Sequence, residues 1–408
     1  MSASTPKFAS ALSTRPDLPT ATAEACRIAL EGLAADGPAD LAICFVSPQY
    51  GDALAGLGAD IKRRTGAALV AGCTGESIVG GAREVEGEPA LALWLARLPG
   101  VDLVPMHLEL EQTPEGGTIV GWSDRLPARW PADSGMLLSG EPFSFPADLL
   151  LERLNEDQPG VPVMGGMASG GWTAGQNRLF LNDETHDNLF DSGAVAIWLH
   201  GAIRLRSVVS QGCRPIGRHF VVTKAERNVI FELSGQPALK QLAEIFQALS
   251  PEEQQLARSG LHVGRVINEY QDEFRRGDFL VRNVLGVDSS TGAIAIGDFV
   301  RAGQTVQFHL RDAASADEDL RELLSEASPP ADTSAGSRGA LLFTCNGRGT
   351  RLFDAPHHDA GALQSVLGDV PVAGFFAQGE AGPIGGKNFL HGFTASVALF
   401  EPRELDQS

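Results

Sequence analysis

The sequence has 408 residues, of which 43 % are hydrophobic and 20 % are charged. This composition excludes disordered and fibrous proteins, and the length is enough for two or three folding units. Acidic residues outnumber basic residues by 51 to 32, which gives a formal net charge of -19. Such a surface repels polyanions, so neither nucleic acid nor an anionic membrane is expected as a partner.

The cysteines and the amino-terminal residues indicate a cytoplasmic protein. Five cysteines lie far apart in the sequence and form no C-x-x-C pair, which argues against a disulfide framework and against a zinc ribbon. The first residues lack the continuous apolar segment of a signal peptide. No uncharged apolar stretch reaches the ~18 residues of a membrane-spanning helix.

An amphipathic helix over residues 19–35 is followed by a pattern that occurs three times. Each copy has an apolar strand, a helix, a second strand that reaches a glycine, a glycine-rich loop and a closing strand. The copies cover residues 41–96, 136–200 and 340–401, with helices at 52–64, 146–156 and 359–368. The similar spacing predicts repeats of one structural unit, and the alternative is chance similarity among α/β units.

A different pattern separates the second and third copies. Residues 219–223 and 229–233 read as a hairpin, and two helices follow at 237–249 and 250–257. The second helix begins with Ser-Pro-Glu-Glu, which is typical of a capped helix start. Three strand-like segments come next, followed by an acidic helix at 315–326 and a linker-like segment at 328–338.

These patterns predict a mixed α/β (α+β) fold in two parts. Repeated strand-helix-strand-strand units form the frame, and the helices pack on mixed sheets. We place the main boundary near residue 208, so the expected domains cover residues 25–208 and 209–402.

Common catalytic motifs are missing from the sequence. It contains no G-x-S-x-G, no H-E-x-x-H, no phosphate-binding G-x-x-x-x-G-K-[ST] and no complete G-x-G-x-x-G. Gly347, Arg348 and Gly349 resemble a fragment of the last motif, but Leu352 occupies the place of its third glycine. We therefore assign no catalytic residue and no metal site.

Polar and reactive residues follow the expected strands, each beside glycines. In α/β proteins ligands bind beyond the carboxyl ends of strands, where loops present backbone N–H groups. The candidate ligand-binding residues are Cys73, Thr74, Glu76, Ser169, Cys213, Cys345, Asn346, Arg348, Glu380, Asn388 and His391.

Each type of candidate also has a purely structural interpretation. A cysteine at a strand end is often a small buried apolar group. The two glutamates, Glu76 and Glu380, occupy corresponding places in two repeats, where they pair with Arg348 or cap loop N–H groups. His391 has no second metal ligand at recognisable spacing, which favours a hydrogen-bonded structural histidine.

Several segments resemble FIST-domain proteins. Two segments are similar to the C-terminal half of that family: GFFAQGEAGPIGGKNFLHGFTASVALF at residues 374–400 and ALLFTCNGRG at 340–349. Two further segments fit the start and the centre of the same half: QGCRPIGRHFVVTKAERNVIFELSGQPAL at 211–239 and FLVRNVLGVD at 279–288, respectively. VAGCTGESIVGG at 70–81 is similar to the signature of the N-terminal half.

The resemblance covers most of residues 25–402 and implies a sensory protein. The family includes bacterial sensory proteins that bind small ligands such as amino acids, haem-binding nitric-oxide sensors, and part of a eukaryotic F-box protein. This sequence has Ala381 where the family has isoleucine, and no F-box or signalling-enzyme segment is recognised in it. The resemblance therefore implies an output through a separate signalling protein.

The sequence thus predicts binding of a small polar molecule. A zwitterion such as an amino acid would place its carboxylate on Arg348 and its ammonium group on Glu76 and Glu380. Three alternatives stay open: a haem sensor with His391 as ligand, an enzyme with a cysteine nucleophile, and a protein–protein adaptor. The sequence itself requires no cofactor.

Overall fold

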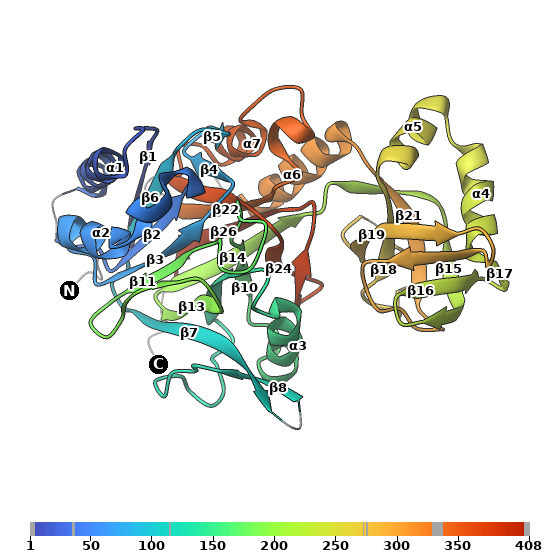
Figure 1. Ribbon diagram of the computed structural model, residues 1–408, viewed down its shortest axis with the longest axis horizontal. Coiled ribbons are helices and arrows are strands. Elements are labelled where there is room, and N and C mark those ends of the chain that lie inside the picture. Colours follow the sequence, from blue (N-terminus) through green and yellow to red (C-terminus); the bar gives the residue numbers. More distant parts are fainter. Residues whose placement is uncertain are drawn as a thin grey trace. The chain divides into compact units, whose positions relative to one another are not determined.

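The computed structural model describes residues 5–34, 37–113, 116–271, 273–274, 276–328 and 338–403. The chain forms two compact units. Unit 1 contains residues up to Val209 together with those from Leu320 onward, and unit 2 contains Ser210–Asp319. Unit 1 holds three mixed sheets with helices packed on them, and unit 2 holds one antiparallel sheet with two helices (Figure 1). The predicted mixed α/β class is confirmed.

Unit 1 is built from three copies of one strand-helix-strand pattern, as the sequence predicts. The first copy has β2 Leu41–Val46, α2 Leu57–Thr65, β3 Leu69–Thr74, β4 Ser77–Gly80, β5 Arg83–Glu86 and β6 Leu91–Arg97. The second has β9 Gly135–Gly140, α3 Ala147–Asp157, β10 Val163–Met167, β11 Leu179–Asn182, β12 Asp187–Phe190 and β13 Ala194–Gly201. The third has β22 Gly339–Cys345, α7 His358–Leu367, β23 Val372–Ala377, β24 Glu380–Ile384, β25 Lys387–His391 and β26 Ala395–Pro402.

Strand pairing is the same in all three copies. The first and second strands are parallel, as the helical crossover between them requires, and the closing strand is antiparallel to the first. An additional strand pairs with each closing strand. These additional strands are β1 Lys7–Ser13 on β6, β7 Val101–Thr113 on β13 and β14 Ile203–Ser210 on β26.

The segment expected as a glycine-rich loop is a β-hairpin in each copy, and this hairpin pairs with another copy's sheet. The first copy's β4 pairs with β23, the second copy's β11 pairs with β3, and the third copy's β24 pairs with β10. The cyclic exchange gives three sheets of equivalent strand order, and β8 Gly116–Val120 extends one of them. The copies therefore cannot form their sheets separately.

One glycine in the second strand of each copy lets that strand lie closer to the backbone of the first strand than a residue with a Cβ atom could. A Cβ atom on Gly72 or Gly165 would lie 1.8 Å from the carbonyl oxygen of Cys44 or Leu138, respectively. The corresponding distance at Gly374 is 1.9 Å. Three equivalent contacts of this kind confirm that the copies are structural repeats.

The three sheets share an apolar core. Phe45, Phe343 and Phe375 come from two repeats, and their ring centroids lie 4.8 to 6.0 Å apart. A cavity of about 20 Å³, large enough for roughly one water molecule, remains between the first strands. The centre of unit 1 is therefore packed, and a ligand must bind outside it.

The remaining elements of unit 1 cover its sheets. The amino-terminal helix α1 Leu18–Leu33 packs on β1 and β6, and a short helix η1 Pro48–Leu54 follows β2. Helix α6 Ala313–Ala327 crosses the boundary between the units, and the short helix η2 Gly349–Arg351 follows β22. Most of the predicted linker-like segment at 328–338 lies outside the described residues.

Unit 2 is a closed antiparallel barrel. Its strands pair in the order β15-β21-β18-β19-β20-β16, and β15 also pairs with β16, which closes the sheet. The strands are β15 Cys213–Glu226, β16 Val229–Leu233, β17 Gln236–Pro237, β18 Leu261–Val266, β19 Phe279–Asp288, β20 Ala293–Ile296 and β21 Thr305–Arg311. Helices α4 Ala238–Ala248 and α5 Pro251–Ser259 follow the predicted hairpin. Ser250 caps α5 as predicted, and together with Glu253 it forms a capping box.

The compact units divide the chain differently from the two consecutive domains that the sequence predicts. The expected boundary near residue 208 is close to the start of unit 2 at Ser210. However, residues from Leu320 onward belong to unit 1, because β23 and β24 pair with strands of the first two repeats.

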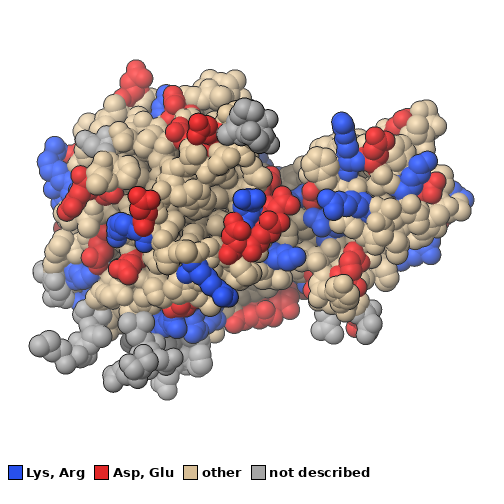
Figure 2. Space-filling model, turned by 90° about the horizontal axis from the view of Figure 1, so that it is seen from below, with Lys and Arg blue, Asp and Glu red and all other residues tan. Residues whose placement is uncertain are grey.

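Acidic and basic side chains are interspersed on the face in view in Figure 2. Among the described residues, no helix is both long enough and apolar enough to cross a membrane.

Unit 2 contains a pair of buried histidines on neighbouring strands. His262 and His309 are direct neighbours on β18 and β21, and their Nδ1 atoms lie 3.0 Å from the backbone oxygens of Gly260 and Gln307. Burial lowers the pKa of each histidine to about 4, and the charges of Arg311 and His262 contribute to the lowering at His262 and His309, respectively. Both side chains are therefore neutral near pH 7.

We expect unit 2 to lose stability as the pH falls from 6.5 towards 4. The unfolded chain binds protons first in this range, so each histidine should cost roughly 2 kcal/mol of stability by pH 5. Hydrogen exchange of the whole protein, corrected for intrinsic rates, should show faster opening of residues 210–319 at pH 5 than at pH 7. His309→Gln should reduce this difference and His186→Gln in unit 1 should not, and equal opening at both pH values would contradict the assignment.

Candidate functional site

The loops after the second strands of the three repeats meet and form hydrogen bonds with one another. The amide of Ser169 in the second repeat donates to the carbonyl oxygen of Thr74 in the first, at 3.1 Å. The amide of Gln378 in the third repeat donates in the same way to Met167 in the second, at 3.0 Å. Two of the three junctions between repeats thus have the same backbone hydrogen bond.

A serine side chain completes the third junction. The amide of Glu76 donates to Ser169 Oγ at 2.8 Å, and this hydroxyl donates to the carbonyl oxygen of Phe376. Ser169 is fully buried, so its hydroxyl is occupied by these two partners. We name the three joined loops, residues 74–76, 167–169 and 376–378, the junction ring.

An exposed ion pair lies beside the junction ring. Arg351 Nη2 bonds Glu76 Oε1, and Arg351 Nη1 donates to the carbonyl oxygen of Asn346 at 2.6 Å. The Arg351 side chain is 57 % exposed and that of Glu76 is 27 % exposed. Asn346 Oδ1 is buried and accepts no hydrogen bond from the described residues. A ligand that reaches this place meets a cation and an anion.

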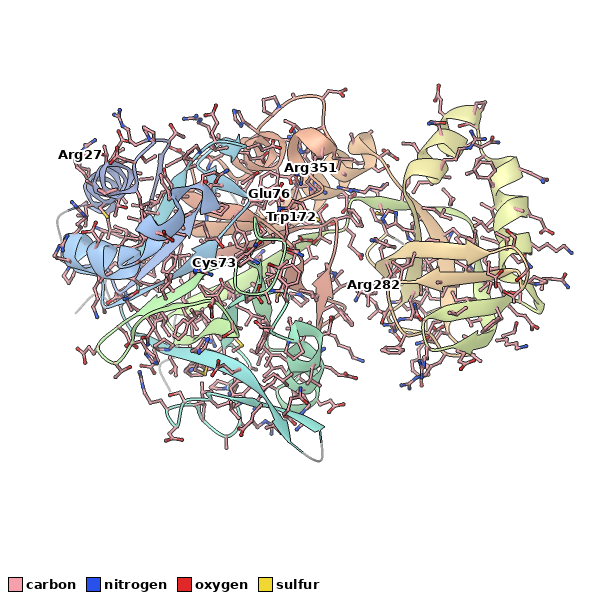
Figure 3. All side chains as sticks on the ribbon, in the orientation of Figure 1. Arg27, Cys73, Glu76, Trp172, Arg282 and Arg351 are labelled. Atoms are coloured by element: carbon pink, nitrogen blue, oxygen red, sulfur yellow. The ribbon has the colours of Figure 1, made fainter. Side chains whose placement is uncertain are left out.

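A tryptophan follows the junction ring on the loop after β10. Trp172 is 82 % exposed, and its amide donates to Gln176 Oε1 at 2.8 Å. The loop runs close to Glu76, because a Cβ atom on Gly170 would lie 3.5 Å from the Cα atom of Glu76. Glu76, Trp172 and Arg351 are labelled in one region of Figure 3.

A buried carboxyl group adjoins the same loops in the third repeat. Glu380 is fully buried, and its Oε2 accepts hydrogen bonds from Thr394 N at 3.1 Å and Thr394 Oγ1 at 2.7 Å. Burial raises the pKa of Glu380 to about 8, although Thr394, Arg348 and the Cys345 thiol oppose the rise. Oε1 accepts no hydrogen bond from the described residues. The carboxyl is therefore mostly protonated at pH 7.

Arg348 lies inside the protein and forms a buried ion pair. Its Nε and Nη2 atoms bond the two carboxylate oxygens of Asp359 at 2.7 and 2.8 Å, and both side chains are at most 1 % exposed. Burial alone would raise the pKa of Asp359, but the guanidinium group holds it well below its usual range. The exposed guanidinium group at these loops belongs to Arg351, which the sequence analysis does not single out.

The structure brings several predicted site residues together and places others elsewhere. Seven of the predicted residues lie in or beside the joined loops of unit 1: Thr74, Glu76, Ser169, Cys345, Asn346, Arg348 and Glu380. Asn388 instead bonds Asn155 and Val161, beyond the far end of β24. Cys73 is buried in the shared core, and Cys213 belongs to unit 2.

His391 pairs with Glu380 in the β24–β25 hairpin. It is 4 % exposed, and its Nε2 atom lies 2.9 Å from the carbonyl oxygen of Gly382. This nitrogen is engaged by the backbone of its own hairpin, as expected for a structural histidine. No cluster of three or more metal-ligating side chains occurs within the part of the chain that the structure describes.

The fold and these loops define a mixed α/β protein with a polar site at the strand ends of three repeats. Family models match the chain as a FIST N domain at residues 40–236 and a FIST C domain at residues 238–383. The protein belongs to the FIST family. FIST domains are generally associated with sensory signal transduction and with binding of small ligands.

Mycobacterial proteins are similar over nearly their whole length. An uncharacterised protein of Mycobacterium tuberculosis is 46 % identical over 390 residues, which cover 95 % of this chain and 98 % of the relative. An uncharacterised protein of Mycobacterium bovis is 44 % identical over 387 residues, which cover 95 % of this chain and 97 % of the relative.

We expect Asp359→Asn to destabilise unit 1 strongly. The substitution leaves the buried guanidinium group of Arg348 without its counter-charge, which costs about 3–5 kcal/mol. Glu31→Gln is the matched control, because it breaks the exposed Arg27–Glu31 pair on α1 and should change stability by less than about 1 kcal/mol. Urea unfolding of both variants measures the difference in the free energy of unfolding. Equally small losses in both would show that the Arg348–Asp359 pair does not hold the loop after β22.

Proposed function

We propose that this protein is a small-ligand sensor that binds a zwitterion, such as an amino acid, beside the junction ring. The observation that carries the proposal is the exposed Arg351–Glu76 ion pair, which joins two repeats. A zwitterion has one group for each charge of the pair: a carboxylate for Arg351 and an ammonium group for Glu76.

The charges of the pair match those of an amino acid. The guanidinium group of Arg351 would hold the carboxylate through paired hydrogen bonds. The Glu76 carboxylate would accept N–H groups of the ammonium. Because an exposed ion pair contributes at most about 1 kcal/mol, a ligand that supplies both charges can replace it at little cost.

Arg351 takes the role in this proposal that the sequence assigns to Arg348. The Arg348 guanidinium could bind a ligand carboxylate only by releasing Asp359, which would leave a buried charge unpaired. Arg351 is already exposed and needs no such change. Trp172 would cover the apolar part of the ligand.

The proposal includes a cytoplasmic location and an output through a separate signalling protein. The five cysteines form no disulfide with one another in the structure, which fits a reducing compartment. The net charge of -19 and the interspersed charges in Figure 2 fit a protein or small-molecule partner better than nucleic acid.

Calorimetry against a panel of amino acids tests the proposal. We expect at least one amino acid to bind, and Arg351→Gln and Glu76→Gln each to weaken binding tenfold or more, about 1.4 kcal/mol. Arg27→Gln is the matched control, because Arg27 also forms an exposed pair with a glutamate, away from the ring (Figure 3), and it should bind as the unaltered protein does. Failure of every amino acid to bind, or undiminished binding by Arg351→Gln, would contradict the proposal.

A further inference from the structure

A cleft lies in unit 1 at the amino end of β10, whereas the junction ring lies at the carboxyl end of that strand. The volume of the cleft is about 610 Å³, which is within the range of roughly 300–1,000 Å³ for small-molecule sites. Five parts of the chain form its lining: residues 132–134, residues 160–162, residues 204–207, the β24–β25 turn with Pro383 and Gly386, and Arg403. None of these residues belongs to the amino-acid site proposed above.

The charged side chains that line the cleft are mostly basic. Arg204, Arg206 and Arg403 line it together with one acidic residue, Asp133. The whole chain has a net charge of -19, so this local excess of positive charge is opposite in sign to the protein as a whole. A cleft lined by one sign of charge attracts ligands of the opposite sign.

Contacts within the protein hold two of these arginines in place. Arg206 Nη2 lies 3.3 Å from Glu401 Oε2, and Arg206 Nη1 donates to the carbonyl oxygen of Ala327 at 3.1 Å. Arg403 forms an ion pair with Asp133. The side chains of Arg206 and Arg403 are 34 % and 28 % exposed, respectively. Because a guanidinium group has five N–H donors, both arginines keep donors for a ligand in the cleft.

The third arginine, Arg204, has a positive charge without a counter-charge. Its side chain is exposed and has no acidic partner among the residues that the structure describes. Arg204 and Arg206 are two positions apart on β14, which places them on the same face of this edge strand. Guanidinium groups bind phosphates and carboxylates through paired, charge-assisted hydrogen bonds. The two arginines of β14 are therefore suited to one doubly charged anion.

Apolar residues complete the lining, and Asn388 holds them in position. Val161, Pro162 and Pro383 line the cleft. Asn388 Nδ2 donates to the carbonyl oxygen of Val161 at 2.8 Å, and Asn388 Oδ1 accepts from the amide of Val163 at 2.8 Å. Asn388 also pairs with Pro383 in the β24–β25 hairpin. A residue predicted for the ligand site thus acts as a positioning residue for this cleft.

We propose that the cleft binds a small organic phosphate monoester. Near pH 7 the phosphate group carries close to two negative charges, and it would lie against the guanidinium groups of Arg204 and Arg206. The apolar part of the molecule would lie against Val161 and Pro383. This inference does not depend on the proposed amino-acid site, because the two sites share no residue.

Calorimetry of the full chain with phenyl phosphate tests the proposal, with phenol as the uncharged reference. We expect saturable binding of one phenyl phosphate per chain near pH 7. Binding should weaken as the salt concentration rises, because salt screens exposed charges. Phenol should bind at least about tenfold more weakly, because it offers no charge to the guanidinium groups. Equal binding of the two compounds would contradict the proposed role of the arginines.

Variants place the ligand in the cleft. Arg204→Gln and Arg206→Gln should each weaken phenyl phosphate binding about tenfold or more, because each removes charged hydrogen bonds. Arg83→Gln is the matched control and should bind as the unaltered protein does. Arg83 is also exposed, and its strand β5 forms the other edge of the sheet that contains β14.

Three results would overturn the proposal: no saturable binding of phenyl phosphate, undiminished binding by Arg204→Gln, or loss of binding in Arg351→Gln. The last result would place the ligand beside the junction ring. Since Arg204 is exposed and has no acidic partner among the described residues, we expect Arg204→Gln to fold normally. Its binding therefore decides the question even where Arg206→Gln is unstable.

Discussion

Hydrogen bonds between the second strand of each repeat and a hairpin from another repeat determine the structure of unit 1. The three hairpins are exchanged in a cycle, so each sheet is complete only when two repeats contribute to it. The glycines at positions 72, 165 and 374 let the second strand of each repeat lie close to a carbonyl oxygen of that repeat's own first strand. The same exchange places the loops after the second strands next to one another and so produces the junction ring.

Burial decides the roles of the charged groups near the ring. Arg348 and Arg351 are three positions apart in the sequence, but one is fully buried against Asp359 and the other is exposed beside Glu76. The buried pair holds the loop after β22 in place, because either charge alone would be costly inside the protein. The exposed pair costs little to open, which suits a site that exchanges its partner for a ligand.

The sequence predicts the repeats well because they depend on local patterns. Strand and helix periodicity and the recurring glycines identify all three copies, and the capped helix at Ser250 is found by its first turn. The hairpin exchange could not be predicted, because it joins strands of different repeats that are far apart in the chain. Closure of the barrel in unit 2 depends on the pairing of β15 with β16 and β21. The alternation of apolar and polar residues along a strand does not specify which strands pair.

The sequence likewise predicts one part of the candidate site and misses another. The strand-end loops are predicted from the pattern, and Glu76, Ser169, Asn346 and Glu380 do lie in or beside them. The choice between Arg348 and Arg351 depends on which one faces Asp359, and residue type and position in the sequence do not reveal this. Asn388 is also a predicted site residue, but it bonds Asn155. Its position in the β24–β25 hairpin places it at the far end of β24.

The central claim is that the three repeats form one cooperative unit closed by the junction ring. Native-state hydrogen exchange at the amides of Glu76, Ser169 and Gln378 tests it most directly, because these amides form the three junctions. The account predicts that all three exchange with the same free energy as the amides of the central strands β2, β9 and β22. Exchange of these amides at a free energy near zero, while the central strands stay protected, would contradict it.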